Sequence, residues 1–185
     1  LFKRPVPPTV RAGRDTLTRE LPFLFVAGFP KSGTSSLFNW LSAHPEVTGA
    51  TQKETCFFAD PGSHVYRPDF NVLHGSADFQ SAFPTPTAET RLLVEATPTH
   101  VYSQRALASI PKLPARCLFI LREPASQIRS SYDYFRNNWT YIPADLTFAD
   151  YLAATRYGTA AFGGNELAER PEEHADYMAW LDPWR

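Results

Sequence analysis

The most informative part of the chain is PFLFVAGFPKSGTSSLFNWL, residues 22–41. The apolar run 23–27 is typical of a buried strand, and Gly28 ends it. A short loop containing Gly33 follows, after which leucine and aromatic residues recur at helical spacing. The stretch therefore predicts a strand, a tight loop and the N-terminus of a helix in direct succession.

The predicted loop combines backbone and side chains that bind phosphate. Backbone N–H groups at a helix N-terminus have no partner within the helix, and the helix dipole adds partial positive charge there. Phosphate binds well at such a point, and Lys31 adds a full positive charge to the loop. The residues expected to form this anion site are Lys31, Ser32, Gly33, Thr34, Ser35 and Ser36.

The spacing of this loop differs from that of the common nucleoside triphosphate loop. Gly28 and Gly33 have the interval of G-x-x-x-x-G-K-[ST], but Thr34 stands where that motif has its lysine. The order PKSGT at 30–34 resembles the loop with which sulfotransferases bind the 5′-phosphosulfate of 3′-phosphoadenosine 5′-phosphosulfate (PAPS). On this motif alone, a Ser/Thr-capped helix that follows a buried strand and binds no ligand is the alternative.

The composition is that of a globular protein. The chain has 185 residues, of which 43% are hydrophobic, and this suffices for one domain with a sizeable core. A net charge of −1 favours neither nucleic acid nor a membrane surface as a partner. No apolar run approaches the ~20 residues of a membrane span. Cys56 and Cys117 give neither a disulfide framework nor a metal-ligand spacing.

The two ends of the sequence carry expectations about location and domain organisation. No signal peptide is recognisable, which favours a cytoplasmic protein, but the sequence begins with Leu1 rather than methionine, so a targeting segment stays an alternative. Residues 1–20 are basic and proline-rich and are expected to form an N-terminal arm. Residues 21–185 are expected to form a single domain, either truncated at its C-terminus or shortened.

Short apolar runs alternate with helical patterns in the rest of the chain. The runs 91–96 and 117–121 predict two more buried strands, whereas the proline and glycine residues of 46–90 predict an irregular region. Helices are expected at 103–110, 124–137, 148–156 and 172–182. This alternation predicts an α/β fold, a P-loop-like parallel sheet flanked by helices in three layers. Ligands bind at the carboxyl ends of the strands in such folds.

A second anion site is predicted directly after the run 117–121. Arg122 follows that strand, and an arginine can hold a phosphate with two parallel hydrogen bonds. Ser130 comes eight residues later, and the pair resembles the arginine and serine that hold the 3′-phosphate of PAPS in sulfotransferases. A pairing of Arg122 with Glu123 or with a nearby acid, on a solvated helix start, is the alternative. The two motifs together extend the resemblance over roughly residues 22–137.

The segment QKETCFF at 52–58 is similar to a segment of the heparan-sulfate-type (carbohydrate) sulfotransferases, in which a glutamate precedes two phenylalanines. The resemblance implies that Glu54 is the general base, which takes the proton of the acceptor. Phe57 and Phe58 would then form a dry wall beside its carboxylate. His100 is a rival base, because some sulfotransferases use a histidine.

The resemblance also implies the reaction. A PAPS-dependent sulfotransferase moves a sulfuryl group to a hydroxyl or amine of a small-molecule or carbohydrate acceptor and releases 3′,5′-ADP. Lys31 would act as a catalytic residue that stabilises the leaving 5′-phosphate, and no metal is expected. Some relatives carry a lysine where this chain has Ala96, a departure that Lys53 would have to compensate. A P-loop nucleotide kinase or NTPase and a catalytically inactive nucleotide-binding domain are the alternative functions.

Overall fold

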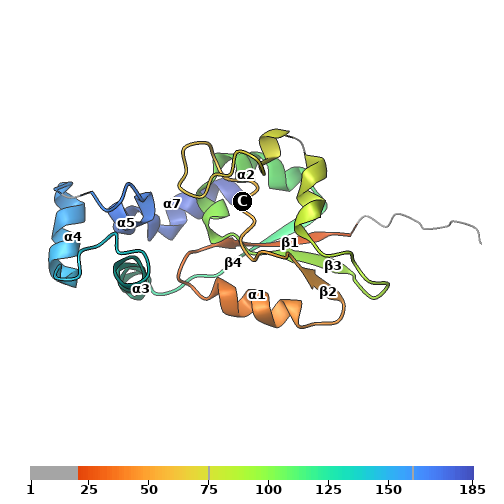
Figure 1. Ribbon diagram of the computed structural model, residues 1–185, viewed down its shortest axis with the longest axis horizontal. Helices are drawn as coiled ribbons and strands as arrows, with labels where there is room; N and C mark the ends of the chain where they lie inside the picture. The colour runs from red at the N-terminus through yellow and green to blue at the C-terminus, as the bar shows by residue number, and fades with distance from the viewer. Residues whose placement is uncertain (1–20, 75, 160) are drawn as a thin grey trace, which may run out of the picture.

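A parallel sheet with the strand order β2-β3-β1-β4 forms the centre of the protein (Figure 1). The computed structural model describes residues 21–74, 76–159 and 161–185, so the expected N-terminal arm, 1–20, lies outside the described residues. The strands of the described chain are β1 (Phe23–Gly28), β2 (Val47–Gly49), β3 (Leu92–Glu95) and β4 (Ala115–Phe119).

Strand β1 is a central strand and explains the apolar run at the start of the chain. It pairs in parallel with β3 on one side, where Phe23 faces Leu93, and with β4 on the other, where Phe25 faces Cys117. A parallel sheet covered on both faces needs apolar side chains in both directions, so the sequence does not alternate. Phe25 and Val26 point to opposite faces and are both fully buried.

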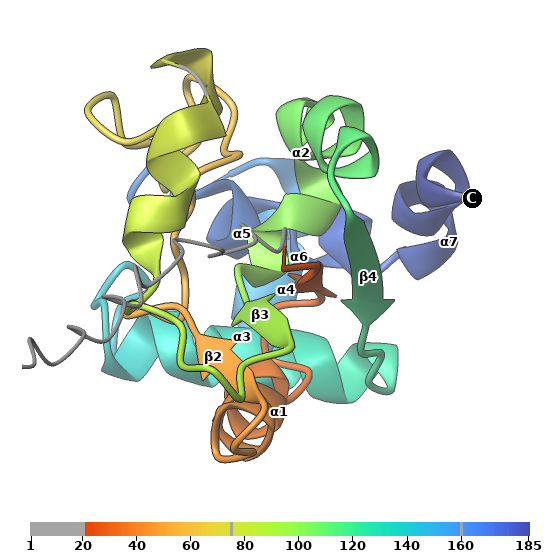
Figure 2. The ribbon, with the colours of Figure 1, turned by 90° about the vertical axis from the view of Figure 1, so that its right-hand side faces the viewer.

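Helices flank the sheet on both faces (Figures 1 and 2). Helix α1 (Thr34–Ser42) covers one face, and α2 (Gln104–Ser109) lies on the other together with short 3₁₀ segments. The predicted α/β class, with a parallel sheet between helical layers, is confirmed. No described helix has both the length and the apolar composition needed to cross a membrane. The 3₁₀ segments are η1 (Val72–His74), η2 (Ser76–Ala82), η3 (Pro98–Tyr102), η4 (Ile110–Lys112) and η5 (Asp182–Trp184).

Most of the remaining helices lie beyond the carboxyl ends of the strands, on the side to which the loop after β1 points (Figure 1). The remaining helices are α3 (Pro124–Asn137), α4 (Phe148–Tyr157), α5 (Glu166–Glu169), α6 (Pro171–His174) and α7 (Tyr177–Leu181). The first three share an apolar cluster of their own, which includes Tyr132, Phe135 and Tyr151. A separate aromatic core fills the space between the sheet and α2 and is centred on Phe25 and Phe79.

Two of the predicted elements are wrong. Residues 46–90 are not wholly irregular, because Val47–Gly49 forms β2 and pairs with β3. The helix expected at 172–182 is broken into α6 and α7. At the break, side chains donate to two carbonyl oxygens that would accept backbone N–H groups in a continuous helix. Tyr102 Oη donates to His174 O (3.1 Å), and Trp180 Nε1 donates to Glu173 O (2.9 Å).

Candidate active site

One cleft of about 590 Å³ opens where the loop after β1 faces α3, and it collects residues from both predicted anion sites. This volume lies within the usual range for ligand sites. The predicted residues that line it come from the loop after β1 and the first turn of α1, from the segment after β2, from the connection between β4 and α3, and from α3 itself: Lys31, Gly33, Thr34, Ser35, Glu54, Arg122 and Ser130. Ser32 is half-buried and Ser36 is exposed, and neither lines the cleft.

The loop after β1 leaves the first turn of α1 open to a ligand. Gly33 is the N-cap residue and has a φ of 101°, a left-handed conformation that side chains rarely adopt. Because glycine has no side chain, nothing on it caps the N–H groups that begin α1. Lys31 also has a positive φ, 62°, which turns the chain sharply between β1 and α1. The local geometry is therefore that of a helix N-terminus prepared for an anion.

Lys31 is a partly buried cation inside the cleft. Its Nζ lies 3.9 Å from the centre of the Tyr134 ring on α3, a cation–π arrangement. Burial lowers the pKa of Lys31, and the charges of Arg122 and Lys53 lower it further, while the Glu54 carboxylate opposes them. A phosphate group bound beside Lys31 would stabilise the charged form of this lysine, which burial disfavours in the free protein.

Arg122 connects the second predicted anion site to the first. Its Nη1 donates to the carbonyl oxygen of Lys31 (3.2 Å). Gln127, a buried residue one turn into α3, donates from Nε2 to Pro30 O (3.1 Å) and thus contacts the same loop. Arg122 is exposed, and the N–H groups of its guanidinium that do not bond to Lys31 O can bind a ligand.

The alternative of an ion pair between Arg122 and Glu123 is wrong. The Glu123 carboxylate turns to its own helix and accepts from Ala125 N (2.9 Å) and Ser126 N (2.7 Å), which caps α3. A hydrogen bond from the Ser126 side chain, the bonds from these two N–H groups and, to a smaller extent, the charge of Arg122 lower the pKa of Glu123. With Glu123 so engaged, Arg122 faces the cleft beside Ser130.

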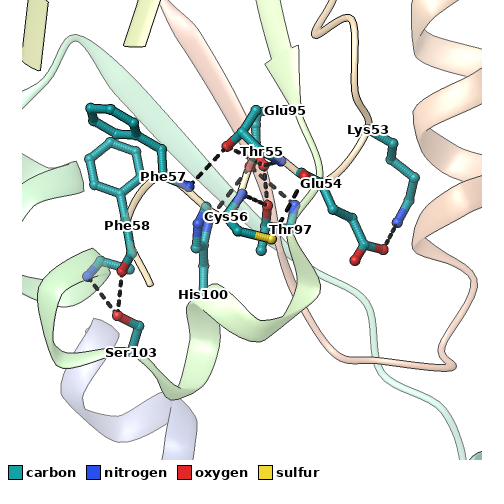
Figure 3. A network of polar contacts seen from close by, with 11 residues as sticks. Lys53, Glu54, Thr55, Cys56, Phe57, Phe58, Glu95, Thr97, His100 and Ser103 are labelled. Atoms are coloured by element: carbon teal, nitrogen blue, oxygen red, sulfur yellow. Dashed lines mark hydrogen bonds and ion pairs between the residues drawn. The ribbon is translucent and has the colours of Figure 1, made fainter. Parts of the chain in front are cut away.

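Glu54 lies at the cleft with an exposed carboxylate that forms an ion pair with Lys53 Nζ. The expected dry wall is wrong. Phe57 and Phe58 are fully buried and pack on Phe79 in the aromatic core, on the other side of the segment from Glu54 (Figure 3). These rings therefore anchor the segment in the core and do not enclose the carboxylate.

His100 does not reach the cleft. It lies on η3 with 1% of its surface exposed, edge-on to the rings of Phe25 and Phe58, and its Nδ1 is 3.5 Å from Oε2 of the fully buried Glu95. Burial lowers the pKa of His100, and the Glu95 charge opposes that effect. An acceptor in the cleft has no access to this ring, so the geometry argues against His100 as the base. His100 instead packs in the core against aromatic rings.

Several lining residues of the cleft were not singled out from the sequence. Gln127 and Ser131 share with Ser130 and Tyr134 the face of α3 that meets the loop, and their spacing of three and four residues on a predicted helix was the signal for this. Others come from loops and short helices that show no comparable pattern in the sequence: His64, Val65, Asn165, Leu167, Pro171 and His174.

The fold and the two anion sites that meet in one cleft make this chain similar to known sulfotransferases. A sulfotransferase from Alicyclobacillus acidocaldarius has the same fold, with a TM-score of 0.68 and 24% identity over 88% of this chain and 67% of that one. No family model matches the chain.

Curated relatives indicate which sulfotransferases the chain is similar to. It is 28% identical over 145 residues to human bifunctional heparan sulfate N-deacetylase/N-sulfotransferase 2, which covers 73% of this chain. It is 27% identical over 151 residues, 80% of this chain, to mouse heparan sulfate glucosamine 3-O-sulfotransferase 3A1. The chain spans only 15% and 35% of the lengths of these relatives. The predicted resemblance to the heparan-sulfate type of sulfotransferase is confirmed.

Proposed function

We propose that this protein transfers a sulfuryl group from PAPS to a hydroxyl or amine of a carbohydrate acceptor and releases 3′,5′-ADP. The observation that carries the proposal is that both anion sites and Glu54 line one cleft, with Arg122 bonded to the backbone of Lys31. A nucleotide that carries phosphate-type groups on both sides of its ribose can occupy the two sites at once. The sulfotransferase relatives support the same donor.

The predicted site residues of the cleft then have separate roles in binding and catalysis. Lys31 and the N–H groups at the start of α1 hold the 5′-phosphate and stabilise the charge that develops on its bridging oxygen. Arg122 and Ser130 hold the 3′-phosphate. Glu54 takes the proton of the acceptor as the new bond to sulfur forms and the bond between sulfur and the bridging oxygen breaks. Positioning and charge stabilisation do most of the work in such in-line transfers.

Aromatic side chains support a carbohydrate acceptor. Trp139 and Tyr141 line the cleft, with ring centroids 5.8 Å apart and an angle of 29° between their planes. Trp139 is 52% exposed, so one large apolar face is open to a ligand. The printed names of the relatives concern heparan sulfate and glucosamine, which supports a sugar hydroxyl or amine as the acceptor group.

Calorimetry with a panel of nucleotides tests the donor. We expect 3′,5′-ADP to bind without Mg²⁺ and more tightly than ADP or ATP, because only 3′,5′-ADP carries a 3′-phosphate for Arg122 and Ser130. Tighter binding of ATP that depends on Mg²⁺ would favour the kinase alternative and reject the proposal. A transfer assay with PAPS and a set of oligosaccharides then separates an enzyme from a binding domain, since an inactive domain would bind 3′,5′-ADP and sulfate nothing.

A further inference from the structure

A fully buried carboxylate lies beside the segment that carries Glu54 (Figure 3). Glu95, the last residue of β3, has no exposed surface. Its Oε1 accepts from Thr55 N and from Thr55 Oγ1, both at 3.0 Å, and also from Thr97 Oγ1. Its Oε2 accepts from Thr97 N at 3.1 Å. Both carboxylate oxygens therefore receive hydrogen bonds, and two of the donors belong to the residue next to Glu54.

The network extends over three consecutive backbone N–H groups. Cys56 N donates to Thr97 Oγ1 (3.1 Å), and Phe57 N donates to Thr55 Oγ1 (3.3 Å), so each is one hydroxyl away from the Glu95 carboxylate. Cys56 has a φ of 56°, a left-handed conformation that a non-glycine residue adopts only when its surroundings hold it. The segment after Glu54 thus adopts an uncommon turn whose N–H groups bond to the Glu95 carboxylate directly or through one hydroxyl.

The chain before Glu54 is tied to the same strand end. Ala96 N donates to Lys53 O at 3.0 Å, directly beside Glu95. The Glu54 residue itself stands between these two anchors, and its side chain is exposed toward the cleft. Burying a carboxylate is costly unless hydrogen bonds replace its water, and here two of the donors come from Thr55 in this turn and two from Thr97 at the end of the strand. The nearby His100 makes no hydrogen bond to it within the described network.

We infer that Glu95 is a positioning residue, which holds the backbone around Glu54 so that the Glu54 carboxylate faces the acceptor. The inference rests on the proposed function, because it assumes that Glu54 is the base. Glu95 touches neither donor nor acceptor and does not line the cleft. It acts through Thr55 and Thr97 on the direction of the Glu54 side chain.

Substitutions at Glu95 and Thr97 test this arrangement through turnover and binding measured separately. Glu95→Gln replaces an acceptor oxygen by an NH₂ group that faces N–H donors, and we expect kcat to fall on the order of 10²-fold while the affinity for 3′,5′-ADP changes less than about twofold. The matched control is Glu89→Gln, on an exposed glutamate of the loop before β3, which leaves both unchanged. Activity is read as 3′,5′-ADP release from PAPS with the acceptor that the transfer assay identifies.

A gentler pair of variants covers the case in which Glu95→Gln does not fold. Thr97→Val keeps the shape but removes the hydroxyl that joins Cys56 N to Glu95, and we expect kcat to fall on the order of tenfold. Thr97→Ser keeps the hydroxyl and restores kcat. If Thr97→Val and Thr97→Ser are equally active, or if the loss appears as weaker 3′,5′-ADP binding, the positioning role is overturned.

A double-mutant cycle with Glu54→Gln separates this inference from the proposed function. If Glu95 acts through Glu54, Thr97→Val adds no further loss of kcat in the Glu54→Gln background. A loss that multiplies with that of Glu54→Gln shows that the network serves something else and rejects the inference alone. Absent 3′,5′-ADP binding by the wild-type protein rejects the proposed donor, and full activity of Glu54→Gln rejects the base and with it the task given to Glu95.

Discussion

Replacement of Arg122 by alanine should remove recognition of the 3′-phosphate and leave the rest of the nucleotide site in place. The structure gives Arg122 two tasks: a hydrogen bond from Nη1 to Lys31 O (3.2 Å), and an exposed guanidinium toward the cleft. A hydrogen bond to a charged group contributes about 1.5–3 kcal/mol, whereas an ordinary one contributes about 0.5–1.5 kcal/mol. The first task affects any nucleotide that uses the Lys31 loop, and the second affects only nucleotides with a 3′-phosphate.

The ratio of two affinities isolates the second task. Calorimetry of 3′,5′-ADP and of 5′-AMP gives a preference for the bisphosphate, in which the contribution of the Lys31 O contact cancels. Arg122→Ala should lower this preference by about 10- to 150-fold, the factor that corresponds to about 1.5–3 kcal/mol. Arg129→Ala is the matched control, because Arg129 is an exposed arginine of the same helix that pairs with Asp133 (3.1 Å) and does not line the cleft. A preference that changes less than about threefold in Arg122→Ala would refute the assignment.

Three further outcomes follow from the described geometry. Glu54→Gln should keep the affinity for 3′,5′-ADP but lower turnover by about 10²–10⁴-fold, as expected for a general base. The control Glu46→Gln, which changes an exposed glutamate paired with Arg91, should leave turnover unchanged. Equal turnover in the two variants would contradict the base role. His100 has a pKa below its ordinary value of 6.5 because of burial, so the unfolded chain binds more protons below pH 6.5 and the free energy of unfolding should fall as the pH falls. Urea titrations at several pH values should show a weaker fall in His100→Gln than in the exposed-site variant His74→Gln. Gly33→Ala places a side chain at a φ of 101° and should lower stability by about 1 kcal/mol in the same assay, together with nucleotide affinity.

The first loop could be predicted from the sequence because its determinants are local. The apolar run of β1, the helical spacing of α1 and the glycine between them lie within one short stretch, and the structure places them as expected. Arg122 and Ser130 could be predicted for the same reason, because only the short connection 120–123 separates β4 from α3. That both sites face one cleft depends on the parallel pairing of β1 with β4, for which the alternation of elements was the only signal.

The parts that could not be predicted depend on contacts between distant residues. Strand β2 has three half-buried residues, too few for a periodic pattern, and exists because β3 supplies its partners. The break between α6 and α7 falls where the hydroxyl of Tyr102, a residue 72 positions before His174, donates to the carbonyl oxygen of His174. Phe57 and Phe58 were assigned to the wrong side of their segment, because no local rule states which way a turn held by Glu95 will face.

The charges of the cleft indicate that the site is arranged for ligand binding at some cost to the free protein. Among the described lining residues, Lys31 and Arg122 are cations and Glu54 is the single carboxylate. Burial lowers the pKa of Lys31, and the charge of Arg122 lowers it further although Glu54 opposes both, so the folded state holds this ammonium group less favourably than water would. The Tyr134 ring and the Lys31 carbonyl offset part of this repulsion without neutralising it. Two adjacent cations with one opposing acid are better explained by a dianionic ligand that bridges them than by the requirements of folding.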